Sequence, residues 1–101
     1  MILDIKCFNE LKNHLGIRVT EEPPFGGVDY FFPFFERMKS DSSVLIIKLD
    51  GERKENMYTV LVSGKLLGDE GSIRVDTSNL TEGVAYVIIE YAKRVWGWTD
   101  N

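Results

Sequence analysis

The sequence predicts an α+β fold, in which an N-terminal helix and a short aromatic helix precede a three-stranded, mostly antiparallel sheet with a C-terminal helix packed on it. Two patterns predict it. Apolar residues recur at helical spacing in both terminal regions, whereas short runs rich in β-branched residues fill the stretch between them. Because 101 residues with 44% apolar content can bury one core, we expect residues 1–101 to form a single domain.

The N-terminal helix is expected over residues 5–15. Apolar residues recur there at the spacing of one helical face, from Phe8 to Leu15. Lys12 and His14 lie in the last turn, where cations complement the helix dipole. This pattern favours a structural role for the histidine.

The aromatic segment, residues 23–38 (PPFGGVDYFFPFFERM), holds five of the six phenylalanines. Four of its residues share one helical face, namely Phe31, Phe34, Phe35 and Met38. We therefore expect a short helix that packs most rings into the core, with Asp29 as its N-cap and an irregular start near Pro33. Phe25 and Tyr30 fall outside the helical stripe, so we expect these two rings to remain exposed.

Three strands are expected in the middle of the chain, over residues 44–49 (VLIIKL), 57–63 (MYTVLVS) and 72–76 (SIRVD). The first strand is nearly continuous in aliphatic residues, which predicts burial on both faces. The segment 64–71 is either a loop or an extension of the second strand into a hairpin.

The C-terminal helix is expected to run from Asn79, as N-cap, to about Trp96. Glu82 lies three residues after the cap, and an apolar stripe continues along the helix to its end. Gly97 can stop the helix. Trp98 follows that stop and has little reason to be buried, which makes it a candidate interface anchor.

One core is expected to unite the aromatic helix, the strands and the C-terminal helix. Its predicted members are Phe31, Phe34, Phe35, Leu45, Ile47, Val60, Val62, Val84, Ile88 and Tyr91. Truncation of one of these rings, as in Phe35→Ala, is expected to cost about 3 to 5 kcal/mol.

Composition argues against several classes of partner. Sixteen acids against twelve lysines and arginines give a net charge of −4, which disfavours nucleic acid and favours a basic protein partner. We expect a cytoplasmic protein, because a single cysteine cannot form an internal disulfide and the N-terminus lacks a basic leader followed by an apolar run. No apolar run is long enough to predict a membrane span.

The residue types that carry catalysis are sparse, so we expect neither an enzyme nor a cofactor or metal site. His14 and Cys7 are the only histidine and cysteine, and a zinc site needs four such ligands at suitable spacings. The cysteine fits better as a small buried residue. A carboxylate pair such as Asp69 with Glu70 leaves an acid-dependent hydrolase as a weaker alternative.

Acidic residues gather in predicted loops. Glu21, Glu22 and Asp29 lie in the first loop, and Asp69 with Glu70 in a later one. Such clusters can steer a cationic protein by their negative field, or simply keep the domain soluble. The candidate partner-binding residues are therefore Glu21, Glu22, Phe25, Asp29, Tyr30, Asp69, Glu70 and Trp98.

An acidic chain of about a hundred residues, with a predicted α+β fold and no catalytic set, resembles the immunity proteins that bacteria make against their own nuclease toxins, as in colicin and contact-dependent inhibition systems. The resemblance lies in size, charge and predicted fold, and it transfers no individual residue. It implies stoichiometric docking of an acidic face over the basic cleft of a toxin. The alternative is a small cytosolic regulatory or ligand-sensing domain of a phage or mobile element, whose pocket the aromatic segment would line.

Overall fold

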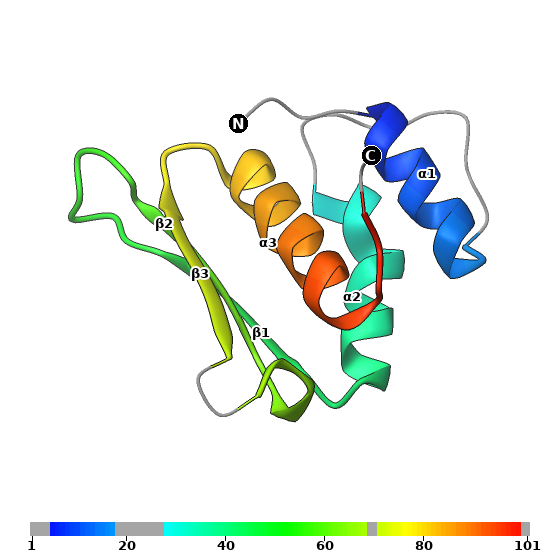
Figure 1. The fold of residues 1–101 in the computed structure, drawn as a ribbon. Helices are drawn as coiled ribbons and strands as arrows, with labels where there is room; N and C mark the ends of the chain where they lie inside the picture. Colours follow the sequence, from blue (N-terminus) through cyan, green and yellow to red (C-terminus); the bar gives the residue numbers. More distant parts are fainter. Residues whose placement is uncertain (1–4, 18–27, 69–70, 100–101) are drawn as a thin grey trace.

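The structure is a computed structural model and describes residues 5–17, 28–68 and 71–99. It has the predicted α+β fold, with three α-helices and a three-stranded antiparallel sheet (Figure 1). The elements are α1 (Ile5–Leu15), η1 (Val28–Phe31), α2 (Phe32–Ser40), β1 (Val44–Leu49), β2 (Tyr58–Ser63), η2 (Lys65–Leu67), β3 (Ser72–Thr77) and α3 (Leu80–Val95), where η marks a short 3₁₀ helix.

The sheet has the strand order β1-β2-β3, and both neighbouring pairs are antiparallel. Val60 in the central strand pairs with Ile47 of β1 and Val75 of β3, so these three side chains share one face of the sheet. We call this the inner face, because it is the face on which α3 packs. The segment between β2 and β3 contains η2, so the loop alternative is the correct one among its described residues.

The layers are the sheet, then α3, then α1 and α2 on the far side of α3 (Figure 1). α3 packs mainly on β2 and β3. The helix approaches the sheet closely at Gly83, where an added Cβ would lie 2.6 Å from the Thr77 methyl carbon and 3.4 Å from a Val60 methyl carbon. The absence of a side chain at this position therefore lets the helix lie against the sheet.

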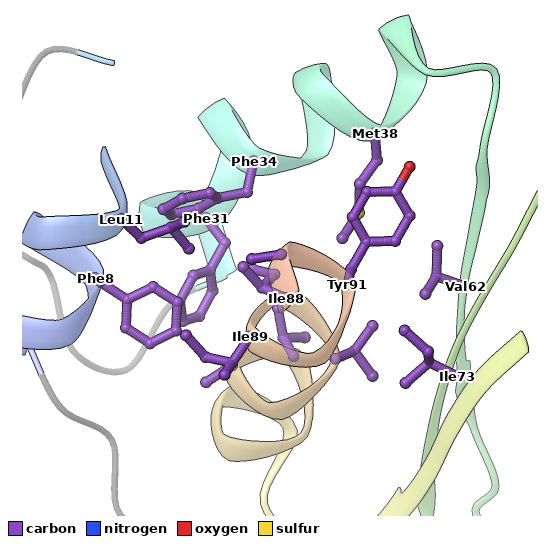
Figure 2. Close-up of a cluster of buried hydrophobic side chains, with 14 of the residues drawn as sticks. Phe8, Leu11, Phe31, Phe34, Met38, Val62, Ile73, Ile88, Ile89 and Tyr91 are labelled. Carbon is purple, nitrogen blue, oxygen red and sulfur yellow. The ribbon is translucent and has the colours of Figure 1, made fainter. Parts of the chain in front are cut away.

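The core surrounds α3 on both sides (Figure 2). Rings from α1, η1 and α2 pack on one side of the helix, and aliphatic side chains of β2 and β3 pack on the other. Seven of the ten predicted core residues are buried, and Phe35, Leu45 and Ile47 are partly buried against the same cluster. The predicted core is confirmed, with these three at its margin.

The aromatic segment begins as a 3₁₀ helix, which explains two corrections. α2 has Phe31 at its N-cap position without a side-chain hydrogen bond, so Asp29 does not cap it. Tyr30 is buried, although we expected it to be exposed. Its ring lies edge-on to Phe31, with centroids 5.2 Å apart, because the three-residue turn of η1 points it into the core instead of along the stripe of α2.

The end of α3 gives the third correction. Asn79 caps the start of the helix as predicted, because its side chain accepts a hydrogen bond from the Glu82 N–H at 3.1 Å. At the other end Gly97 has φ +65°, a left-handed conformation that reverses the chain. The Trp98 N–H then donates to Ala92 O at 3.2 Å, and the Trp98 ring is buried, not exposed.

Candidate functional site

The predicted site residues are only partly within the described chain. Five of them lie outside the described residues, namely Glu21, Glu22, Phe25, Asp69 and Glu70. Asp29 is exposed at the start of η1, whereas Tyr30 and Trp98 are core residues. Tyr30 and Trp98 were chosen because their rings were expected to be exposed, and that expectation was wrong.

The acidity of the chain is unevenly distributed. Six of the sixteen acids lie outside the described residues, namely Asp4, Glu21, Glu22, Asp69, Glu70 and Asp100, against one of the twelve lysines and arginines, Arg18. The described part consequently carries nearly balanced charge.

The outer face of the sheet, opposite α3, carries an aliphatic strip. The strip consists of Val44, Ile46 and Leu61, and Ile46 pairs with Leu61 across the β1–β2 ladder. Val44 is 53% exposed and Ile46 48% exposed. The helices all lie on the other side of the sheet in Figure 1, which explains this exposure.

β1 is an edge strand, so the prediction that it is buried on both faces was wrong. It is the first strand of the sheet order and pairs with β2 alone among the described residues. Because α3 covers mainly β2 and β3, even the inner-face side chains of Leu45 and Ile47 are only partly buried. Leu49 at the strand end is 68% exposed.

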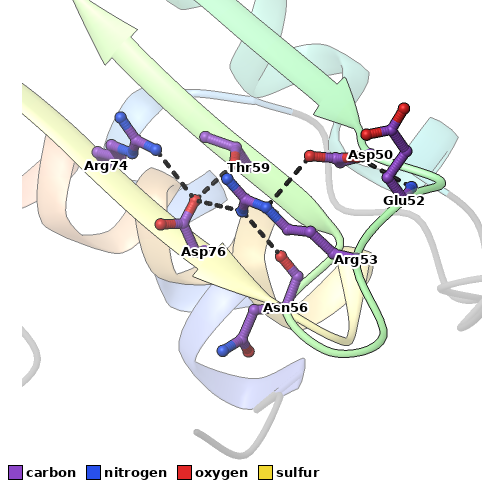
Figure 3. A network of polar contacts seen from close by, with 7 residues as sticks. All are labelled: Asp50, Glu52, Arg53, Asn56, Thr59, Arg74 and Asp76. Atoms are coloured by element: carbon purple, nitrogen blue, oxygen red, sulfur yellow. Dashed lines mark hydrogen bonds and ion pairs between the residues drawn. The ribbon is translucent and has the colours of Figure 1, made fainter.

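A polar network borders the aliphatic strip on the outer face (Figure 3). Its centre is Asp76, whose Oδ1 accepts hydrogen bonds from Thr59 Oγ1 at 2.5 Å and Arg74 Nη2 at 3.4 Å. Arg53 links this centre to the β1–β2 loop, with Nη1 3.8 Å from Asp76 Oδ1 and Nε 3.2 Å from Asp50 Oδ2. The hydrogen bond from Thr59, followed by the charges of the two arginines, lowers the pKa of Asp76. The carboxylate therefore stays ionised, and its charge is balanced by the two arginines.

A second polar cluster joins the start of β1 to α3. Tyr91 OH donates to Asp41 Oδ2 at 2.9 Å and lies 2.7 Å from Ser43 Oγ, which therefore donates to the phenol oxygen. Trp96 Nε1 donates to the same carboxylate oxygen at 2.9 Å. Burial is the main cause that raises the pKa of Tyr91 to about 12. These hydrogen bonds join the segment between α2 and β1 to the end of α3.

Lys12 is a buried lysine, which the sequence analysis placed in the last turn of the first helix without predicting its burial. Its side chain is 2% exposed, and its Nζ lies 4.1 Å from the centroid of the Tyr30 ring and 6.0 Å from that of Phe34. Burial lowers the pKa of Lys12. The missed signal is that Lys12 stands four residues after Phe8 and three before Leu15, on the apolar stripe of the helix.

This burial predicts a pH-dependent stability. A lowered pKa means that the folded protein releases the proton before the unfolded chain does, so the free energy of unfolding should rise as pH increases toward 10.5. Lys12→Met, which keeps the length and removes the charge, should be more stable than the native protein at pH 7, and the difference should shrink by pH 9.5. Urea unfolding at pH 7, 8 and 9.5 measures this. A stability gap independent of pH would contradict it.

The remaining chemically active side chains have structural contacts. His14 Nε2 lies 2.8 Å from Trp96 O, which requires that nitrogen to carry the proton and join α1 to the end of α3. Cys7 is partly buried against the core. Within residues 5–17, 28–68 and 71–99, no group of three or more His, Cys, Asp or Glu side chains could hold a metal ion.

The described helices are also too short or too polar to cross a membrane. The surface with exposed aliphatic side chains and an unpaired strand edge is therefore the strongest candidate site in the described part of the chain. Comparison with family models, with curated proteins and with solved structures finds no match.

Proposed function

We propose that this chain is a non-enzymatic, cytoplasmic binding protein that neutralises a cationic protein partner, and that the partner is a nuclease toxin domain. The observation that carries the proposal is the open aliphatic surface of β1 and the outer sheet face. A monomeric protein rarely leaves a regular aliphatic edge strand uncovered, because such an edge invites pairing with another chain. A binding surface explains why this one is retained.

The polar groups support binding over catalysis. Tyr91 is hydrogen-bonded to Asp41 and Ser43, and the Asp76 carboxylate accepts a hydrogen bond from Thr59 and pairs with two arginines. Each group is already engaged in a contact that joins two elements. These contacts give each group a structural role that needs no substrate.

The charge distribution supports a cationic partner. The acids outside the described residues stand in short segments with little basic charge, including Glu21 with Glu22 and Asp69 with Glu70. Concentrated negative charge of this kind accelerates encounter with a basic protein and mimics the phosphates that a nuclease binds.

The ligand-sensing alternative receives no comparable support. It required the aromatic segment to line a pocket, but Phe31 and Phe34 are completely buried and their rings pack against Phe8, with centroids 5.3 and 5.7 Å away. These two rings are therefore core residues that line no pocket, and of the other described phenylalanines in the segment Phe35 is partly buried and Phe32 is 56% exposed.

The test is inhibition of purified, basic nuclease domains from bacterial toxins. One domain of such a panel should lose activity at a one-to-one ratio, with association that slows as salt increases. Lysine substitution of Glu21, Glu22, Asp69 and Glu70 should slow that association at low salt and have less effect at high salt. If every nuclease stays fully active with excess protein, the proposed function is wrong.

The matched control changes net charge equally at other positions. It carries lysine at Glu10, Glu36, Glu52 and Glu55, which are exposed in the described part of the chain. Because both variants gain the same charge, a difference in association rate reports the position of the acids. Equal slowing by both variants would show that only net charge matters and would contradict the role of the four predicted residues.

A further inference from the structure

The free edge of β1 has a regular set of backbone groups that are available for pairing. Asp50 N–H donates to Met57 O at 2.7 Å, which continues the β1–β2 ladder by one residue. Because hydrogen-bonded pairs alternate in an antiparallel ladder, the backbone groups of Ile46 and Lys48 also point toward β2. The backbone groups of the alternate residues, Leu45, Ile47 and Leu49, therefore point to the free edge.

The backbone at the start of β1 supports this alternation. Ser43, two residues before Leu45, donates its N–H away from β2 to Met38 O at 3.0 Å. No backbone hydrogen bond of Leu45, Ile47 or Leu49 to another described segment occurs along this edge. The edge therefore presents three donors and three acceptors in the geometry of a strand.

Side chains on both sides of this edge favour an aliphatic occupant. Val44 and Ile46 are exposed on the outer face, and Leu49 is exposed at the end of the inner face. An added strand with apolar residues on both faces would extend the sheet and cover all three. The strand carries no proline and no bulge, so the one feature that guards it against pairing is the charge of Lys48.

The charge of Lys48 favours an acidic residue on the strand that binds to this edge. Lys48 is the one charged residue of β1, it lies on the outer face, and it forms no ion pair within the described chain. Two acids lie near it on that face: Asp50, two residues along the chain, is paired with Arg53, and Asp76, beyond Thr59 in the register, is bound to that threonine and to arginines. A carboxylate on the incoming strand would give Lys48 its missing counter-charge.

We propose that the free edge of β1 receives an extended strand of the partner protein, aliphatic in sequence and with a glutamate or aspartate opposite Lys48. This inference deepens the proposed function. It rests on that function in one respect, namely that the partner is a protein. The backbone pairing supplies affinity and the carboxylate supplies selectivity. In the partner, basic residues outside this strand would meet the acidic segments of the chain.

A second copy of this chain fits the edge less well. Antiparallel self-pairing centred on Ile46 would place Lys48 opposite Val44 of the second copy, where it meets no acid. Centring the pair on Lys48 would oppose the two Lys48 side chains, and centring it on Leu49 would place Lys48 opposite Asp50 but would overlap the two strands only at their ends. A foreign strand can pair along the whole of β1 and still place an acid opposite Lys48.

The test uses two synthetic ten-residue peptides of alternating valine and threonine, one with a central glutamate and one with lysine in its place. Binding is followed by NMR on the native protein, through the amide signals of Leu45, Ile47 and Leu49. The glutamate peptide should bind about two- to fivefold tighter than the lysine peptide. Lys48→Glu should reverse this preference.

Two substitutions at one exposed position separate backbone pairing from side-chain contact. Leu49→Pro removes an outward N–H without breaking a β1–β2 bond, and it should weaken both peptides by about tenfold. Leu49→Thr keeps the N–H and should bind within about threefold of the native protein. Unchanged thermal unfolding confirms that both variants fold.

Three outcomes would overturn the proposal. Equal binding of the two peptides would remove the role of Lys48, and equal binding by the proline and threonine variants would remove backbone pairing. A dimer detected by ultracentrifugation and abolished by Leu49→Pro would assign the edge to a second copy. Peptide binding can succeed while nuclease inhibition fails, so this proposal and the proposed function fail separately.

Discussion

Phe34→Ala should lower the free energy of unfolding by about 3 to 5 kcal/mol, the range for a fully buried phenylalanine. The Phe34 ring has no exposed surface, and it lies between Phe8 of α1 and Trp96 at the end of α3, with centroids 5.7 and 6.4 Å away. Its removal leaves a cavity where three helices meet. A domain of this size has a total stability of about 5 to 15 kcal/mol, so the variant should be close to unfolding.

Phe32→Ala is the matched control, because Phe32 belongs to the same helix and is 56% exposed. It should change stability by no more than about 0.5 kcal/mol. Phe35 is partly buried, so Phe35→Ala should fall between the two, below the cost expected from the sequence alone. If Phe34→Ala does not fold, urea unfolding of Phe34→Leu takes its place in the comparison with Phe35→Ala and Phe32→Ala. Equal effects at Phe34 and Phe32 would contradict the packing of α2.

Gly83→Ala should destabilise the protein, even though the intrinsic helix propensity of alanine is about 1 kcal/mol more favourable than that of glycine. The new methyl group would lie 2.6 Å from the Thr77 methyl carbon. Thr77 cannot easily rotate away, because its hydroxyl is bonded to the backbone of Asn79 at 3.1 and 3.3 Å. Overpacking of this kind costs about 1 to 3 kcal/mol, and the constraint on Thr77 favours the upper half of that range.

Gly51→Ala serves as the control for this prediction. Gly51 lies in the β1–β2 loop, and an added Cβ there would meet no atom within 4 Å. Thermal unfolding of the two variants should give a clear decrease for Gly83→Ala and a change near zero for Gly51→Ala. A gain in stability at Gly83 would mean that α3 does not approach the sheet as closely as described.

Periodicity predicted the elements because it is a local property of the chain. The first helix was predicted at residues 5–15 and observed at Ile5–Leu15, and the strand at 44–49 has the same bounds in the structure. The cap at Asn79 was also predictable, since its side chain and Glu82 are only three residues apart. These features require no knowledge of distant contacts.

The errors concern burial, which depends on how layers assemble. An aliphatic run such as VLIIKL reads as a buried strand, but its position at the edge of the sheet and beyond the cover of α3 is decided by tertiary packing. Tyr30 and Trp98 were misplaced because a 3₁₀ turn and a reversal at Gly97 redirect rings without changing the apolar pattern. Lys12 shows that a charge on an apolar stripe can be buried against an aromatic face.

The candidate site was less predictable than the fold. Charge counting pointed to acidic loops, and those residues lie outside the described chain apart from Asp29. The outer sheet face could not be recognised, because Val44, Ile46 and Leu61 come together only through the register of β1 and β2. The contact of Arg53 with Asp76 was equally unpredictable, because the pairing of β1 with β2 decides where the loop that carries Arg53 lies.

The central claim is that β1 has a free edge, and hydrogen exchange measured by NMR on the dilute protein tests it most directly. The amides of Ile46 and Lys48 bond to β2 and should exchange slowly, whereas those of Ile47 and Leu49 face solvent and should exchange at least about tenfold faster. This alternation is the result the structure predicts. Equal protection of all four amides would contradict it, because it would show that the edge of β1 is already covered.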